Sequence, residues 1–434
     1  MHMHVGCVLV FAGVAPGVAE LTELIRSRLD LVPRYRRSVV AVPLRQGRPL
    51  WIDDPNLALS YHVRDVALAG SADEAALARF AGGLLSQPLD HDKPLWELWL
   101  VERLAGERFA LVAKTHHALV DGEDNRDLVS VLLDSEPGAP RPESASAWLP
   151  PPRPGPAQLL LEALTERASD PREAVATVRA LGARTREELE WRDLDPLARN
   201  GAPPRSRLNV PIGPHRRFTW IEIGLGRLRK VKERLGGTVN DAVLTAVAGA
   251  VGRYLRVHGE DTDGLVLRAL VPLADAASGR VLAIYVPLPV GIDDPRRRHA
   301  EISRTLDGLR TSGRALAAEA LIELDGFAPP TILSQAARLQ ARQRAFNLVV
   351  TNVPGPQSPR YLLGRELRSI YPAVPLARNQ ALSVALVSYA GRLCFGLLAD
   401  HDALADLDLL AGLLEEALAE LPKGARAKGP RAGP

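Results

Sequence analysis

Residues 114–122 read KTHHALVDG, so two adjacent histidines stand shortly before an aspartate and a glycine. Two runs rich in β-branched and aromatic residues precede them, Trp96–Leu104 and Phe109–Thr115. The short link Ala105–Glu107 contains a glycine and predicts that these runs form a hairpin. Apolar residues at helical spacing resume a few positions after the motif. The pattern therefore predicts that both histidines lie where a strand passes into a loop.

The alternation of strand and helix signals occurs twice along the chain. Before the hairpin, a buried strand is predicted at 5–11 and an amphipathic helix at 18–29. Between residues 137 and 156 the chain is rich in Pro, Ser, Ala and Gly, a composition that neither continues a helix nor pairs within a sheet. Beyond it we predict helices at 157–189, 225–235, 239–256, 296–316, 331–345 and 403–421, and strands at 217–223, 265–271, 282–288, 347–351, 382–389 and 393–398.

These signals predict an α/β protein with two domains. A chain of 434 residues is long for one ordinary domain and allows two cores of about 200 residues each. We place the first domain, with the histidines, at 1–136 and a Pro-rich crossing with a helical linker at 137–214. The second domain follows at 215–421. The tail 422–434 consists largely of Lys, Arg, Gly and Pro, which bury too little surface to fold, so we expect it to be disordered.

Composition narrows the class of protein. The formal net charge of +3 is small for this length, which argues against a broad nucleic-acid-binding face. Cys7 and Cys394 are the only cysteines and show no disulfide or metal-ligand spacing, so a reducing, cytoplasmic compartment fits best. The chain has no uninterrupted apolar run of about 20 residues, and any association with membranes or lipid droplets is therefore expected to be peripheral.

Several motifs occur in a fixed order around the two histidines. They are Pro94-Leu95-Trp96, the His-His segment with Asp121 and Gly122, Asn240-Asp241, and Asn352-Val353-Pro354-Gly355-Pro356. In these motifs and their order the chain resembles the wax ester synthase/acyl-CoA:diacylglycerol acyltransferase family. That family lies within the CoA-dependent acyltransferase and condensation-domain superfamily, which His-His-x-x-x-Asp-Gly marks. The resemblance implies two pseudo-symmetric domains, each a mixed sheet flanked by helices, with an active-site tunnel between them.

The resemblance also implies roles for individual residues. His117 would be the general base that activates a hydroxyl of a fatty alcohol or diacylglycerol against an acyl-CoA thioester, a task that suits imidazole because its ordinary pKa lies near neutrality. His116 and Asp121 would hold the loop in shape, and Gly122 would allow close approach of the backbone. Asn240 is our candidate donor to the oxyanion. We expect substrate contacts from Pro94, Leu95, Trp96, Asp241 and Asn352.

Other interpretations of these residues remain open. Asn240 and Asp241 could serve only to cap a helix, and Trp96 could belong to the core. We expect no metal, because neighbouring residues of a strand point to opposite faces and no third ligand stands at suitable spacing, and we expect no cofactor beyond acyl-CoA as substrate.

Two other functions are also considered. One is a transferase that acylates a polyketide or other secondary-metabolite hydroxyl. The other is a catalytically silent lipid-binding or lipid-droplet protein, because residues 123–126, EDNR, are more polar than the family pattern at that place.

Overall fold

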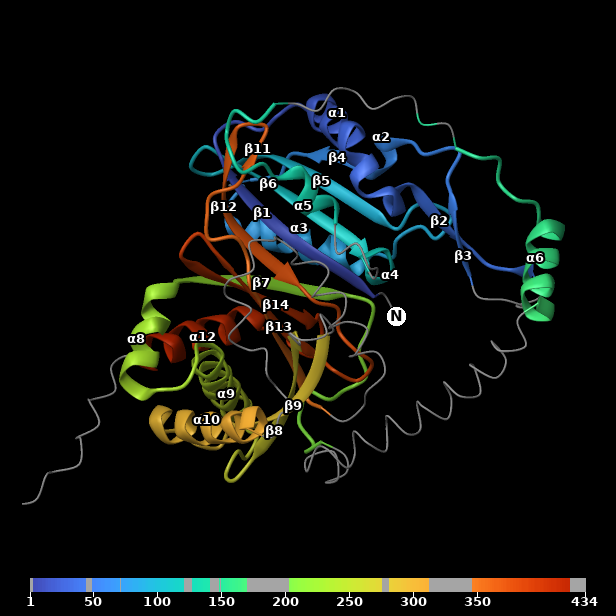
Figure 1. Cartoon of the computed structure of the whole chain (residues 1–434). Coiled ribbons are helices and arrows are strands. Elements are labelled where there is room, and N and C mark those ends of the chain that lie inside the picture. Colours follow the sequence, from blue (N-terminus) through green and yellow to red (C-terminus); the bar gives the residue numbers. More distant parts are fainter. Residues whose placement is uncertain are drawn as a thin grey trace, which may run out of the picture.

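The computed structural model of the chain describes residues 3–43, 49–70, 72–120, 127–140, 148, 150–169, 203–274, 281–311 and 346–421. Within these ranges, two six-stranded mixed sheets lie one above the other (Figure 1). The first has the strand order β11 (Tyr361–Leu362), β12 (Arg365–Ala373), β1 (His4–Ala12), β6 (Arg108–His116), β5 (Trp96–Leu104), β4 (Val63–Val66). The second has the order β7 (Arg216–Gly224), β14 (Arg392–Asp400), β13 (Leu382–Tyr389), β10 (Leu348–Val353), β8 (Val266–Ala274), β9 (Val281–Pro289).

Helices surround both sheets. On the side of the first sheet they are α1 (Val18–Arg28), α2 (Leu59–His62), α3 (Glu74–Ser86), α4 (His117–Val120) and α5 (Leu128–Leu132), with 3₁₀ turns at Leu29–Leu31 and Pro33–Arg36 and a small sheet of β2 (Arg37–Val40) and β3 (Leu50–Asp53). Helix α6 (Pro156–Ser169) follows. The second sheet carries α8 (Leu225–Leu235), α9 (Val239–Val257), α10 (Pro295–Thr311) and α12 (Leu407–Glu420).

Local patterns predicted most of these elements. The hairpin of β5 and β6, the strands β1, β7, β9, β10, β13 and β14, and the helices α1, α8 and α9 lie where the sequence places them, to within a few residues. The last helix begins at Leu407 instead of 403, because residues 401–406 form turns. The predicted helix at 331–345, the far end of the helix predicted at 157–189, and the tail lie outside the described residues.

Two elements that bridge the halves of the chain were not predicted. Strand β12 comes from the second half of the sequence but pairs antiparallel with β1 in the first sheet, with Gly6 opposite Ala373. Its run contains Arg365, Arg368 and Pro372, which weaken a strand signal. The two sheets therefore do not coincide with the two halves of the sequence, since a late segment completes the early sheet.

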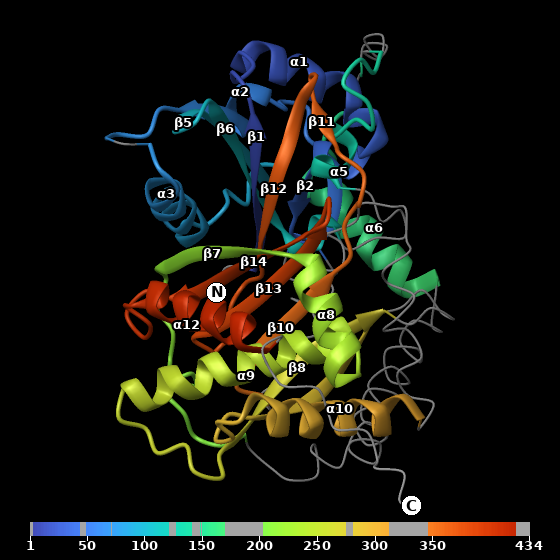
Figure 2. The ribbon, with the colours of Figure 1, turned by 90° about the vertical axis from the view of Figure 1, so that its left-hand side faces the viewer.

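Helix α3 is the second such element, and it lies between β1 and β6 on one side and β7 on the other (Figure 2). Asp73 caps it through Oδ1, which accepts a hydrogen bond from the amide of Ala76 at 2.8 Å. A Cβ atom added at Gly82 would lie 3.2 Å from the carbonyl O of Arg216, so glycine lets the helix approach the backbone of β7. The hydroxyl of Ser86 accepts a hydrogen bond from the amide of Arg216 at 2.8 Å. Helix α3 thereby joins the two sheets.

Within the described ranges, no single helix has the length and apolar character that crossing a membrane requires, although α8 and α9, bent by 97° at their break, pass that test as a pair.

Candidate active site

The two histidines stand at the junction between β6 and α4, as the sequence predicts. The amide of His116 donates to the carbonyl O of Leu95 at 2.9 Å, and the amide of His117 donates to the carbonyl O of Met3 at 3.0 Å. Strands on both sides of β6 thus hold the backbone of the pair. Both side chains are half-buried, which leaves the imidazole of His117 partly accessible from outside the core.

The side chain of His116 supports the turn that carries His117. Its Nδ1 accepts a hydrogen bond from the amide of Ala118 at 3.2 Å, in the manner of an N-cap for the short helix α4. An accepting nitrogen carries no proton, so this bond selects the imidazole tautomer with its proton on Nε2. The ring also lies roughly edge-on to the rings of His4 and His91, with centroids 6.2 and 6.3 Å away. Such contacts suit a residue that maintains the conformation of the loop, and this structural role stays our prediction for His116.

The Pro94-Leu95-Trp96 segment leads into β5, which begins at Trp96, and lies directly beside the histidines. All three residues are buried. The Trp96 indole donates to the carbonyl O of Tyr35 at 2.8 Å, and the ring of His62 stacks on it at 4.5 Å between centroids. Together with the bond from His116 to Leu95, these contacts give the segment a structural function in presenting the histidines. Its predicted substrate binding stays a prediction.

A buried ion pair lies next to the histidines, and the sequence analysis missed it. Lys114 and Glu97 stand opposite each other in β6 and β5, and their Nζ and Oε2 atoms are 4.0 Å apart. Lys114 is fully buried, and desolvation lowers the pKa of its amine while Glu97 opposes that shift. The signal was present in the sequence, because a lysine within the otherwise apolar run FALVAK is rare unless it is paired.

Asp121 and Gly122 lie outside the described residues, and so do the polar residues 123–126. The chain is described again at Asp127, which is buried and caps α5. Its Oδ1 accepts a hydrogen bond from the amide of Ser130 at 3.0 Å, whereas Oδ2 has no hydrogen-bond partner among the described residues. Desolvation raises the pKa of this carboxyl group to about 7. The structure therefore holds a titratable acid just beyond the histidine loop.

We expect Asp127→Asn to make the protein more stable than the wild type at about pH 8, by on the order of 2–4 kcal/mol. Because the pKa of Asp127 is higher in the folded protein than in the unfolded chain, the wild type loses stability as the pH rises from about 4 to about 7. Asparagine retains the capping oxygen without this titration. Urea unfolding of both proteins at about pH 5 and pH 8 measures the effect, and an equal pH dependence in both would contradict it.

In the second half, Asn240 and Asp241 lie in the first turn of α9. The N-cap is Thr238, whose hydroxyl accepts a hydrogen bond from the amide of Asp241 at 3.3 Å. The Asp241 carboxylate accepts hydrogen bonds from the hydroxyls of Thr238 and of Ser303 on α10, the latter at 2.9 Å. Asp241 is fully buried and Asn240 half-buried. The Asp241 contacts tie α9 to α10, while the oxyanion role of Asn240 and the substrate contact of Asp241 stay predictions.

The Asn352–Pro356 segment ends β10. Asn352 is half-buried and stands opposite Leu386 of β13. A Cβ atom added at Gly355 would lie 2.3 Å from the carbonyl O of Ser388, a distance that only glycine avoids. The turn is thus packed tightly against the end of β13. Substrate binding by Asn352 stays a prediction.

The described residues form a groove and a separate pocket. A groove of about 1350 Å³ runs between α3 and β7, and a pocket of about 690 Å³ is lined by residues around 203–211 and 378–380. Neither is lined by His116 or His117, and the predicted tunnel remains a proposal. Among the described residues, no cluster of three or more His, Cys, Asp or Glu side chains is arranged to hold a metal ion.

Two models of one protein family match most of the chain. The wax ester synthase/diacylglycerol acyltransferase catalytic domain matches residues 1–243, and the C-terminal domain of the same family matches residues 279–422. A probable diacylglycerol O-acyltransferase of Mycobacterium tuberculosis, tgs2, is 33% identical over 438 residues, which cover 96% of this chain and 94% of that protein.

Solved structures show the same arrangement of sheets. The wax ester synthase/diacylglycerol acyltransferase from Marinobacter aquaeolei VT8 is similar with a TM-score of 0.67 and 28% identity, over 97% of this chain and 94% of that one. The first condensation domain of the CDA synthetase shares the fold, with a TM-score of 0.57 and 17% identity over 98% and 92% of the two chains. The chain thus belongs to the wax ester synthase/diacylglycerol acyltransferase family of acyltransferases.

Proposed function

We propose that the protein transfers a fatty acyl group from acyl-CoA to the hydroxyl of a long-chain alcohol or a diacylglycerol, with His117 as the general base. The observation that carries the proposal is the placement of His117. It is a half-exposed imidazole at the end of β6, with its backbone fixed to β1 and its turn capped by His116. Membership of the family supports the reaction, and the name of the Mycobacterium tuberculosis relative supports diacylglycerol as one acceptor.

The proposed chemistry needs one proton to move twice. As the acceptor oxygen attacks the thioester carbonyl, the neutral imidazole of His117 takes the hydroxyl proton, and a tetrahedral intermediate forms. When the carbon–sulfur bond breaks, the imidazolium returns that proton to the departing thiolate, which leaves an ester and free CoA. General-base assistance of this kind typically increases the rate by about 10² to 10⁴. No residue needs to form a covalent intermediate.

Both substrates would meet His117 at the junction of the two sheets. We propose a tunnel there, in which protein surrounds the thioester and limits attack by water. The apolar tails of the substrates come from lipid, so we propose that the protein works in the cytoplasm with peripheral contact to membranes or lipid droplets.

The purified protein is expected to convert decanoyl-CoA and hexadecanol, or decanoyl-CoA and a diacylglycerol, into ester and free thiol in equal amounts. A thiol-reactive dye follows CoA release, and mass spectrometry of the extracted lipid identifies the ester. Ester formation only with secondary-metabolite hydroxyls would move the acceptor assignment to that class. Binding of decanoyl-CoA without thiol release for any acceptor would support the catalytically silent alternative.

A further inference from the structure

The groove between α3 and β7 contains side chains from both halves of the chain. One wall is the face of α3 that carries Ala75, Ala78 and Gly82, and the other is formed by residues 214–220 at the start of β7 and by the turn that precedes α12. Ala75 and Ala78 project little into the groove, and its volume of about 1350 Å³ is large enough for a sizeable organic ligand.

Positive charge converges on this groove from both walls. Arg79 projects from α3 and is exposed, while Arg217 on β7 is half-buried and donates from Nε to the carbonyl O of His401 at 3.1 Å. Arg217 also lies near Asp402, whose carboxyl pKa is lowered mainly by a hydrogen bond from His401 and to a smaller extent by this arginine. Three acidic side chains also line the groove: Glu74 is paired with Arg108 at 2.8 Å, Asp402 lies 2.9 Å from the imidazole of His401, and Asp408 is exposed. The guanidinium groups of Arg79 and Arg217 are the positive charges that an anionic ligand in the groove would contact.

One end of the groove lies at the end of α3. It includes Ser86, Gln87 and Pro88 at the end of α3, and the chain then continues to His91, whose ring lies 6.3 Å from that of His116. Arg79 precedes Ser86 by seven residues, a rise of about 10 Å along the helix axis. The positive charges thus stand at a distance from the histidine end that a flexible arm can span.

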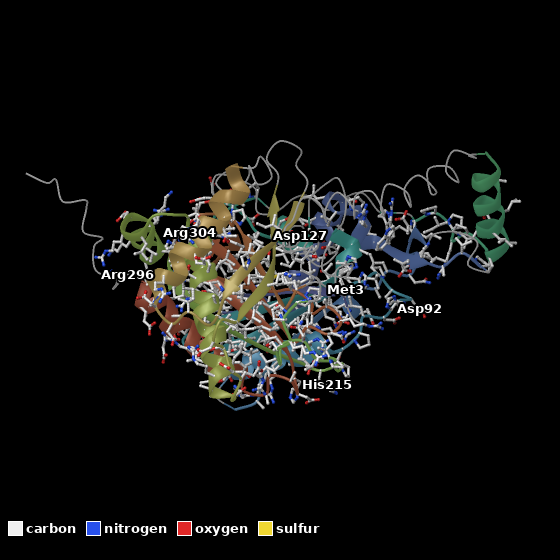
Figure 3. All side chains as sticks on the ribbon, turned by 90° about the horizontal axis from the view of Figure 1, so that it is seen from below. Met3, Asp92, Asp127, His215, Arg296 and Arg304 are labelled. Atoms are coloured by element: carbon white, nitrogen blue, oxygen red, sulfur yellow. The ribbon has the colours of Figure 1, made fainter. Side chains whose placement is uncertain are left out.

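We propose that this groove binds the phosphate groups of the acyl donor, so that the nucleotide end of CoA lies near Arg79 and Arg217 and the thioester arm runs along α3 toward His117. The proposal rests on the proposed function for its donor. A coenzyme A thioester carries its phosphates at the far end of a flexible arm, which matches charges that are set apart from the base. The arginines of α10, Arg296 and Arg304, lie well away from Met3, the residue whose carbonyl binds the amide of His117 (Figure 3).

The test compares donors with and without phosphate. In the variant Arg79→Glu/Arg217→Glu, the KM for decanoyl-CoA is expected to rise at least about tenfold, because two attractive charges become repulsive. With decanoyl-N-acetylcysteamine, which has no phosphate, kcat/KM is expected to stay within about twofold of wild type. The single variant Arg79→Glu should also raise KM for decanoyl-CoA without affecting decanoyl-N-acetylcysteamine, but to a smaller degree. Because Arg79 is exposed, this substitution leaves the fold intact. The matched control Arg227→Glu/Arg229→Glu reverses two exposed charges on α8, outside the groove.

Further measurements distinguish a failure of the groove proposal from a failure of the proposed acyltransferase function. An equal loss with both donors, or an unchanged KM for decanoyl-CoA in the double variant, overturns the proposal. The difference in KM for decanoyl-CoA between the double variant and the wild type is also expected to shrink at high salt, because salt screens the charges at positions 79 and 217. Titration calorimetry with CoA itself measures binding without turnover. A protein that binds CoA through these arginines but forms no ester would refute the proposed function and retain the groove, whereas ester formation with CoA affinity unchanged in the variants would refute the groove alone.

Discussion

Turnover of decanoyl-CoA and hexadecanol will fall at least about a hundredfold when His117 is replaced by alanine, while KM for both substrates stays close to wild type. Alanine cannot take the hydroxyl proton, and the half-exposed position of His117 means that its loss leaves little cavity in the core. Initial rates of thiol release, measured from about pH 5 to about pH 9, provide the comparison.

The neighbouring histidine offers a matched control. In His116→Asn, the amide oxygen can accept the hydrogen bond from Ala118 that Nδ1 accepts in the wild type, so the cap and most of the activity should remain. His116→Ala removes that acceptor and is expected to lower the melting temperature. If His117→Ala retains more than about a tenth of the wild-type rate, or if His116→Asn loses as much turnover as His117→Ala, the assignment of the base to His117 is wrong.

Replacing Glu97 by leucine is expected to destabilise the protein by about 3–5 kcal/mol, because it leaves the ammonium group of Lys114 buried without its counter-ion. Lys114→Met should cost less, since Glu97 would keep its hydrogen bond from the Trp99 indole at 3.2 Å. The double variant Glu97→Leu/Lys114→Met replaces the pair by apolar groups and should recover most of the lost stability.

The pH dependence of the Glu97→Leu variant gives a second measure. Desolvation already lowers the pKa of Lys114 in the folded protein, and loss of Glu97 lowers it further. The unfolded chain then binds more protons than the folded one, so stability of the variant should rise with pH relative to wild type. Urea unfolding at about pH 7 and about pH 9.5 tests both expectations. If the changes in the free energy of unfolding of the two single variants add up to that of the double variant, Lys114 and Glu97 have no coupling energy and the expectation is wrong.

Local patterns predicted the part of the site that depends on neighbouring residues. The alternation along residues 96–115 predicted the hairpin, and with it the place of His116 and His117 at the end of β6. The same reasoning missed α3, because Gly82 and Gly83 weaken a helix signal. The reason for Gly82 lies outside its own segment, in the backbone of β7 that packs against it.

Burial could not be predicted in the same way. Asp127 follows four polar residues and looks in the sequence like an ordinary charged residue, yet the fold encloses it; the apolar run before Lys114 indicates burial but does not identify Glu97 as its partner. No residue within a few positions of Asp127 indicates which elements will cover it. The contacts of Asp241 could not be predicted either. The sequence places this residue at the start of a helix, but only the fold brings the hydroxyl of Ser303 on α10 to its carboxylate.

By itself, the sequence determined the α/β character of the chain, its family and the strand-end position of the histidines, because each depends on residue order and on the local periodicity of strands and helices. Only the tertiary structure decided that β12 completes the first sheet and that α3 joins the two sheets beside a groove carrying charges from both halves. Those features depend on hydrogen bonds and packing between segments hundreds of residues apart, which no local pattern encodes.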